Sequence, residues 1–428
     1  MDNVFDIFLN EKGKFRESLT GDTNGMLSLY EASFLGTNGE DTLTQAMEFT
    51  TTRLKDVMPH LTPEFGRHIG QALELPIDLR MARLEAKNYT DQYVKESNWS
   101  SDVLELAKLD FNLVQSLHQT ELAELVRQVF DDIPHRHYFT RETLFESLEW
   151  WKELGLCDKL TFARDRPLEC FLWTVGIFPK PHQSTCRIEL AKNVAILLVI
   201  DDIFDSYGTL SELVLFTNAI RRWDLGAMEE LPQYMKICYM ALYNTTKEIG
   251  YRVLKEHGSC IVSHLKRTQK ICTYPQRIFR KRGHNSRDIH GLGAYFLSHG
   301  ASINRGTCRG YPKLFSCSGR ILRLRDDLET ATEEQQRGDV ASSIECFMKE
   351  QKLSSEAEAR THIKQLIQNQ WKELNAELMA PNTLPLSTIK ACCNLSRTAQ
   401  AIYDHGHDNR ASWVHDHADS LFCKPIVL

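Results

Sequence analysis

The stretch VAILLVIDDIFD, residues 194–205, decides how this sequence folds and contains its most distinctive chemistry. An apolar run, Val194 to Ile200, is followed at once by Asp201, Asp202 and, three residues later, Asp205. The run is far shorter than the roughly 20 residues of a membrane span, so we expect a core helix and no membrane-spanning segment. On a helix, Asp201 and Asp205 share one face and Asp202 lies beside them.

Three carboxylates at the end of a buried helix need water or cations, because an isolated buried charge costs several kcal/mol or more. They offer hard oxygen ligands without His or Cys, which is the ligand type that magnesium and manganese prefer. A simpler interpretation also remains open for this motif taken alone. The carboxylates would then form an acidic helix end that emerges from the core into solvent.

A second group of oxygen side chains occurs in DDLETATEE, residues 326–334. Asp326, Thr330 and Glu334 are separated by four residues each, so they line one stripe of a helix. Solvated Glu-rich helix faces have the same spacing. This pattern alone therefore does not distinguish a metal-binding stripe from an ordinary surface.

A third group is Arg164-Asp165-Arg166, which precedes the apolar and aromatic run 170–173. Guanidinium groups bind diphosphate oxygens in a bidentate manner and stay charged at any relevant pH. A surface ion pair is the competing interpretation. Taken together, the three groups predict a site with metal-binding oxygens on two helices, arginines for an anion, and aromatic side chains for an apolar remainder.

Helical periodicity dominates the rest of the chain. Apolar residues recur at helical spacing at positions 213, 216, 220 and 223, and again from 363 to 378. Ser355 and Glu358 have the spacing of a capping box at the start of the second pattern. Alternating strand patterns and hairpin dipeptides are almost absent. We therefore predict an all-α fold.

The chain has 428 residues, more than one core usually holds, so we expect two domains. Residues 1–125 would form a first helical domain and residues 149–428 a metal-binding domain. Residues 126–148 contain a proline and weak periodicity, which predicts a linker or insertion. Residues 259–310 contain ten Lys/Arg against one acid and many glycines. Residues 403–428, rich in His, Asp and Gly, predict a loop followed by a docked end.

Composition excludes several functional classes. The net charge of −6, from 51 basic and 57 acidic residues, argues against a nucleic-acid binder that neutralises phosphates. The 12 cysteines include no CxxC pair, which argues against a disulfide framework or zinc ribbon and favours a reducing compartment. Two HxH pairs, His405/His407 and His415/His417, suggest zinc, but the adjacent Asp and Gly residues suit an exposed loop equally well.

The order of the motifs resembles the catalytic half of plant class I terpene synthases. The resemblance rests on FARDRPLECFLW (162–173), LLVIDDIFDSYGTL (197–210) and GRILRLRDDLETATEEQQRGDVASSIECFM (319–348). GKFRESLTGDTNGMLSLYEASFL (13–35) resembles the family's N-terminal helical domain, and IYDHGHDNRAS (402–412) resembles its pocket-closing loop. The resemblance implies the class I terpenoid synthase helical bundle behind a truncated N-terminal α-helical domain. The start shows no transit composition, so a cytoplasmic location is expected as written, or a plastid if the start is truncated.

The resemblance also implies roles for individual residues. Asp201, Asp202 and Asp205 would bind two magnesium ions, and Asp326, Thr330 and Glu334 a third, with manganese as the alternative metal. Arg164, Arg166 and Arg323 would hold the diphosphate, Trp173 would face the carbocation, and Tyr403 and Asp408 would lie at the closing end of the pocket. The partner would be a small-molecule prenyl diphosphate, and the protein a monomer.

The sequence also departs from the family pattern. It lacks the tandem arginine and distant tryptophan of many monoterpene cyclases, which favours acyclic products of the ocimene, myrcene or linalool type. Residues 259–310 replace a pair of pocket-lining helices, which predicts a changed pocket shape rather than impaired metal binding.

The leading hypothesis is a monoterpene synthase acting on geranyl diphosphate. A sesquiterpene synthase acting on farnesyl diphosphate and a helical protein with a relict site remain alternatives. A prenyl-diphosphate synthase is disfavoured, because it would carry a second aspartate-rich motif instead of the Asp326, Thr330 and Glu334 stripe.

Overall fold

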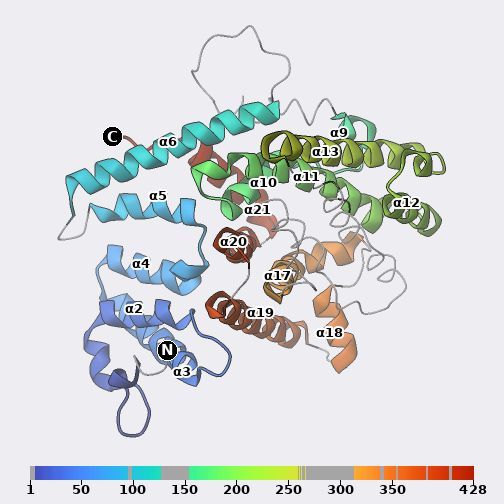
Figure 1. Cartoon of the computed structure of the whole chain (residues 1–428). Helices are drawn as coiled ribbons and strands as arrows, with labels where there is room; N and C mark the ends of the chain where they lie inside the picture. Colours follow the sequence, from blue (N-terminus) through green and yellow to red (C-terminus); the bar gives the residue numbers. More distant parts are fainter. Residues whose placement is uncertain are drawn as a thin grey trace. The chain divides into compact units, whose positions relative to one another are not determined.

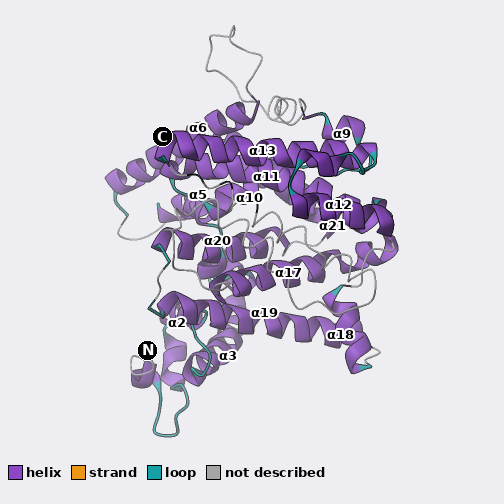
Figure 2. Cartoon of the chain, turned by 45° about the vertical axis from the view of Figure 1, so that its right-hand side comes forward, coloured by secondary structure: helices purple, strands orange, loops and turns teal. Residues whose placement is uncertain are grey.

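The computed structural model describes residues 5–94, 99–126, 154–258, 313–337, 342–352, 355–381, 384–403 and 407–428, with single positions 260, 262 and 266. Helices and the loops between them make up this part of the chain, and it contains no strand (Figure 2). The all-α prediction is therefore confirmed. The expected linker at 126–148 and the basic stretch at 259–310 lie outside the described residues, apart from Val126 and the three single positions.

The chain divides into two compact units. The first comprises Met1–Arg80 and Lys364–Thr383, and the second comprises Met81–Ile363 and Leu384–Leu428. Because the segment in which we expected the domain boundary is not described, the limits at 125 and 149 stay a prediction.

The first unit packs short helices around a small apolar core. Met26, Tyr30, Leu54 and Ile69 are buried together in it. Asn375 links two parts of this unit that are distant in sequence, by donating hydrogen bonds to backbone carbonyls about 340 residues earlier. Its elements are η1 (Asp6–Phe8), η2 (Glu17–Gly21), α2 (Thr23–Ser33), α3 (Asp41–Val57), η3 (Met58–His60), α4 (Pro63–Glu74), η4 (Ile77–Leu79) and the part of α19 (Glu356–Met379) from Lys364 onward.

The second unit holds all the residues that the sequence assigns to the site. Figure 1 labels its α-helices. Its helices are α5 (Ala82–Tyr93), α6 (Ser101–Val126), α9 (Leu156–Lys159), α10 (Pro167–Ile177), η5 (Pro181–Gln183), α11 (Ser184–Asp202), η6 (Ile203–Tyr207), α12 (Leu210–Arg222), η7 (Leu225–Met228), α13 (Gln233–His257), α17 (Lys313–Arg337), α18 (Ser343–Gln351), the start of α19, α20 (Leu386–Tyr403), α21 (His407–Ala418) and η8 (Asp419–Cys423).

Helix α10 is the centre of this unit. It starts with Pro167 at its first position, where a missing N–H costs nothing, and every residue from Cys170 to Ile177 is buried, as expected of a core helix. It packs against α11 and α20, and α20 in turn packs against α17. Gly176 permits the contact with α20, because a Cβ atom there would collide with Thr398 and Met81.

Helix α11 contains the apolar run from Val194 to Ile200 and is buried along almost its whole length. The predicted core helix is therefore confirmed. No helix among the described residues is long and apolar enough to span a membrane. Arg187 anchors the start of α11: it is fully buried and forms an ion pair with Glu121 of α6, with N–O distances of 2.7 and 2.5 Å.

The segment 403–428 differs from the prediction. A loop was expected after Tyr403, but residues 407–418 form helix α21, which continues into the π-helical turn η8. The reason is an apolar face that the His and Asp residues obscure: Trp413, Val414, Ala418 and Leu421 are all buried. The predicted docked end is borne out by hydrogen bonds between residues 420–426 and α6.

Candidate active site

The aspartate-rich segment lies where α11 changes into the π-helical turn η6. Helix α11 ends at Asp202, and residues 203–207 continue it as a π-helical turn, a local widening that is frequent at functional sites. Ile203 and Phe204 are buried and fix this turn in the core. Asp201 is half-buried, and Asp202 has only 7% of its surface exposed. The backbone of Asp205 belongs to the same turn.

Arg164 binds the end of α11 directly. Its backbone N–H donates to Oδ2 of Asp202 at 2.8 Å, and its side-chain Nε donates to Oδ1 at 2.6 Å. The ring of Phe162, two residues earlier, stacks on Tyr207 of η6 with centroids 3.8 Å apart. The structure thus brings the predicted arginine and the predicted carboxylates together. It also uses both oxygens of Asp202 to hold the loop ahead of α10.

Arg166 occupies the N-cap position of α10. Its Nη1 lies 3.4 Å from Oε2 of Glu169, three residues into the helix. The Arg166 side chain keeps about a third of its surface exposed, at 36%. The Arg166 side chain therefore lies at a helix start and is reachable from solvent.

The second group of carboxylates lies on α17. Arg323 Nη1 contacts Oδ2 of Asp326 at 3.3 Å, and its Nη2 contacts Oδ1 of Asp327 at 2.5 Å. Thr330 Oγ1 donates to the backbone carbonyl of Asp326 at 2.8 Å, as expected one helical turn later. Asp326 and Thr330 therefore lie one turn apart, as their spacing predicted, and Arg323 pairs with Asp326.

Asp327 is a residue that the sequence reasoning missed. It is completely buried, and its Oδ2 accepts hydrogen bonds from the backbone N–H of Ser343, at 3.1 Å, and from the Ser343 hydroxyl. It thus joins α17 to the start of α18 while it pairs with Arg323. Its only signal in the sequence is its place beside Asp326, the same place that Asp202 has beside Asp201.

The aromatic part of the site is a pair of rings. Trp173 on α10 and Tyr403, the last residue of α20, meet edge to face with centroids 5.7 Å apart. Trp173 is 7% exposed, so its ring is almost entirely enclosed. Helices α10 and α20 therefore place these two aromatic rings in contact, while the expected roles of Trp173 beside a carbocation and of Tyr403 at the closing end of the pocket stay predictions.

The donor chemistry of these residues fits a hard divalent cation. Asp201, Asp326 and Thr330 offer oxygen atoms only, which suits magnesium or manganese. Among the described side chains, no group of three His, Cys, Asp or Glu residues is arranged so that it could hold a metal ion. The side chains of Asp205, Glu334 and Asp408 lie outside the described residues, so their assignments stay predictions.

The histidine pairs can be followed only in part. His405 and the side chain of His407 lie outside the described residues. His417 stacks on Trp413 with centroids 3.9 Å apart, and its Nδ1 is 2.8 Å from the Trp413 carbonyl oxygen. His417 therefore belongs to the internal packing of α21, and no zinc-type cluster occurs in the described part of the chain.

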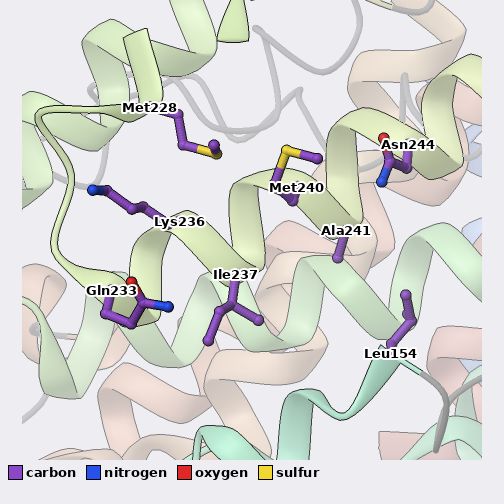
Figure 3. Close-up of a pocket in the computed structure, with 8 residues that line it drawn as sticks. All are labelled: Leu154, Met228, Gln233, Lys236, Ile237, Met240, Ala241 and Asn244. Atoms are coloured by element: carbon purple, nitrogen blue, oxygen red, sulfur yellow. The ribbon is translucent and has the colours of Figure 1, made fainter. Parts of the chain in front are cut away.

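A cavity of about 450 Å³ opens elsewhere, on α13 and η7 (Figure 3). It is lined by Leu154, Met228, Gln233, Lys236, Ile237, Met240, Ala241 and Asn244. In Figure 3 the side chains of Met228 and Met240 reach toward the same space. None of the predicted site residues whose side chains are described lines this cavity.

Sequence profiles of two domains match this chain. The profile described as "Terpene synthase family, metal binding domain" matches residues 152–278 and 290–373. The profile described as "Terpene synthase, N-terminal domain" matches residues 1–73. The first match covers both acidic motifs and Arg164, and it skips residues 279–289, within the stretch where we expected the sequence to depart from the family.

Plant proteins of known name resemble the chain over nearly its whole length. It is 51% identical to "Monoterpene synthase TPS4, chloroplastic" of Cananga odorata, covering 99% of this chain and 72% of that protein. It is 47% identical to "Geraniol synthase, chloroplastic" of Ocimum basilicum, covering 98% and 73%. It is 45% identical to "R-linalool synthase, chloroplastic" of the same plant, covering 99% and 73%.

Solved structures share the fold. A limonene synthase with 2-fluorolinalyl diphosphate is 34% identical and superposes with a TM-score of 0.89, over 100% of this chain and 79% of that one. Isoprene synthase from grey poplar leaves, in complex with three Mg²⁺ ions and dimethylallyl-S-thiolodiphosphate, is 33% identical with a TM-score of 0.86, over 100% and 81%. The helical arrangement around α10, α11 and α17 is therefore that of class I terpenoid enzymes.

Proposed function

Because the chain belongs to the plant terpene synthase family, we propose that it ionises geranyl diphosphate with magnesium and releases an acyclic monoterpene. The substrate choice is supported by relatives named geraniol synthase and R-linalool synthase. The metal is supported by the name of the matching metal-binding domain and by the three Mg²⁺ ions of the isoprene synthase complex.

One observation carries this proposal: Arg164 is bound to the aspartate-rich end of α11 through both oxygens of Asp202. A cation-binding segment and an anion-binding side chain are thereby held next to each other. A bound diphosphate needs both, because its oxygens must be matched by metal charge and by guanidinium donors. Asp201 would bind metal from one side, with Asp205 beside it, while Asp202 orients Arg164.

The second half of the diphosphate site would be on α17. Asp326 and Thr330 lie one turn apart and would hold another metal ion together with Glu334. Arg323, held by Asp326 and Asp327, would donate to the diphosphate. When bound, magnesium would supply Lewis-acid stabilisation of the charge that develops on the departing diphosphate. The chain's own arginines add fixed donors aimed at the same charge.

The apolar end of the site would hold the carbocation. Trp173 and Tyr403 offer aromatic rings, each worth about 0.5–2 kcal/mol to a nearby cation. Burial of Trp173 within α10 keeps water away from one wall of the pocket. No nucleophile is required for ionisation. Release of an alkene or an alcohol would depend on whether one water molecule reaches the cation.

The test is a direct assay of the purified chain with geranyl and farnesyl diphosphates, with magnesium and with a chelator, and with volatiles identified by mass spectrometry. The expected result is ocimene, myrcene or linalool from geranyl diphosphate, which disappears when the metal is removed. Product from farnesyl diphosphate alone would make the chain a sesquiterpene synthase. No product from either substrate, with an intact helical circular dichroism spectrum, would indicate a relict site.

A plastid is the place of action that the relatives favour. The three relatives reported above, from Cananga odorata and Ocimum basilicum, are all named chloroplastic. A fluorescent fusion of the gene's complete open reading frame, viewed in leaf cells, tests this location. Diffuse cytoplasmic fluorescence would contradict it.

A further inference from the structure

A set of amide side chains on α6 binds the backbone of residues 420–426. Asn112 Nδ2 donates to the carbonyl of Ile426 at 2.8 Å, and its Oδ1 accepts from the N–H of Ile426 at 2.8 Å. Gln115 Nε2 donates to the carbonyl of Leu421 at 3.0 Å. Gln119 Nε2 donates to that of Phe422 at 2.6 Å. We call Asn112, Gln115 and Gln119 the amide ladder.

The ladder satisfies carbonyl groups that a helix end leaves without partners. Helix α21 continues into η8, and the last turn of any helix has carbonyls with no intrahelical donor. Positions 112, 115 and 119 fall on one face of α6, and that face meets η8. Lys87 of α5 adds its ammonium group to the carbonyls of Ser420 and Lys424 at 2.6 and 2.8 Å. A cation at this end is favourable for the helix dipole.

The amide ladder binds the backbone of Phe422, and two other rings contact its side chain. Its side chain is completely buried, with its ring 5.4 Å from Phe171 of α10 and 5.8 Å from His118 of α6. The His118 and Phe171 rings are themselves 6.2 Å apart. Three rings therefore close the space between α6, α10 and η8. In Figures 1 and 2 the end of the chain lies beside α6.

This cluster connects to the proposed carbocation site through a single helix. Phe171 and Trp173 are two residues apart on α10, so their side chains leave the helix about 200° apart, on nearly opposite faces. One face meets Phe422, and the other places Trp173 against Tyr403. A shift of Phe422 would therefore move α10, and with it the tryptophan.

We propose that the amide ladder of α6 consists of positioning residues for the reaction, which set the place of Trp173 by binding residues 420–426 and pressing Phe422 against α10. The catalytic consequence rests on the proposed function. The structural consequence, that a change in the ladder is transmitted to α10, does not rest on the proposed function. The ladder touches no predicted ligand of metal or diphosphate, so substrate binding should not depend on it.

The test uses substitutions that remove a donor without changing size. Asn112→Asp and Gln119→Glu each replace an amide NH₂ with an oxygen, which repels the facing carbonyl. Gln119→Met removes the donor without adding charge and separates loss of the hydrogen bond from repulsion. Thr120→Glu is the matched control, because it adds the same charge to an exposed position of the same helix.

The first measurement is amide hydrogen exchange by mass spectrometry. We expect about ten-fold faster exchange in residues 419–428 and a smaller acceleration in residues 167–177 for the ladder variants, and none for Thr120→Glu. Faster exchange in 419–428 without any change in 167–177 would overturn the proposal, as would unchanged exchange in both. This measurement decides the matter even for a chain without activity.

The second measurement is steady-state kinetics with product analysis. In the active enzyme we expect kcat to fall about ten-fold in the ladder variants and the ratio of alcohol to hydrocarbon products to change. The KM for the prenyl diphosphate should stay within about two-fold, because the arginines and carboxylates are untouched. A rise in KM with unchanged kcat and product ratio would contradict positioning of Trp173. Inactivity of the unmodified chain would count against the proposed function, and not against the ladder.

Discussion

The carboxylate of Asp202 is bound at both oxygens by Arg164, through the backbone N–H at 2.8 Å and through Nε at 2.6 Å. A residue that the motif offers as a metal ligand thus serves to fix an arginine. On α17, Asp327 binds Arg323 through one oxygen and Ser343 through the other, and Asp326 precedes it as Asp201 precedes Asp202. In both motifs the first aspartate is half-buried and the second is buried. We infer a division of labour, in which the first binds metal and the second orients a guanidinium group.

A double-mutant cycle tests the Arg164–Asp202 pair. Arg164→Ala and Asp202→Ala should each lower kcat/KM, and the double variant should lose much less than the sum of the two losses. The expected coupling is about 1–3 kcal/mol, as for contacting residues in one network. Asp158→Ala, on the exposed side of α9, is the control and should be additive with Arg164→Ala. Additivity of the Arg164 and Asp202 variants would show that the pair does not act as a unit.

Asp327 should matter more for stability than its serine partner. Asp327→Asn breaks the ion pair between the fully buried Asp327 carboxylate and the Arg323 side chain, which is 16% exposed, and it weakens the bonds to Ser343. We expect this to cost about 3 kcal/mol of unfolding free energy. Ser343→Ala removes only the hydroxyl bond and should cost about 1 kcal/mol. Urea unfolding followed by circular dichroism measures both. Equal losses in the two variants would mean that the Arg323 pair contributes little.

Removal of one partner of the Glu121–Arg187 pair should strongly destabilise the second unit. Arg187 has no exposed side-chain surface and Glu121 has 2%, so Glu121→Gln would leave a guanidinium charge buried without its partner. We expect a loss of about 3–5 kcal/mol. Glu356→Gln breaks the more exposed pair with Arg360 and should cost about 0–1 kcal/mol. Similar midpoints of thermal unfolding for the two variants would contradict the difference.

His118 should make stability depend on pH. Burial, with smaller contributions from the charges of Arg187 and Arg83, lowers the pKa of His118 to about 3. The unfolded chain binds a proton at this residue near pH 6.5 and the folded chain does not, so stability falls as the pH drops from 6.5 towards 3. Between pH 7 and pH 5 the loss from this residue should be about 2 kcal/mol.

His118→Phe, which cannot take up a proton, isolates that contribution. The ring would still lie between Phe171 and Phe422, so the packing is kept approximately. The variant should gain about 2 kcal/mol relative to the unmodified chain when the pH falls from 7 to 5. Urea unfolding at the two pH values measures this. Parallel losses of stability in both proteins would show that His118 is protonated in the folded state as well.

Some helices and site residues could be predicted from the sequence, and others could not. The helix over Val194–Ile200 follows from composition and length, and the buried positions 213, 216 and 220 of α12 follow from helical periodicity. The Asp326 and Thr330 stripe also follows from spacing. Helix α21 could not be predicted in this way, because its few apolar residues are interspersed with charged and His residues. The expected metal-binding roles of Asp205 and Glu334, whose side chains lie outside the described residues, stay predictions.

The sequence by itself determined the helices, the order of the motifs and the chemical type of the site, because each of these depends on residues within a few turns of one another. Only the tertiary structure decided which oxygens pair with which cations. Asp202 and Arg164 are 38 residues apart, and Glu121 and Arg187 are 66 apart. At such separations, the partner of a charge is set by which helices pack together and which groups are shielded from water, and no local pattern records that choice.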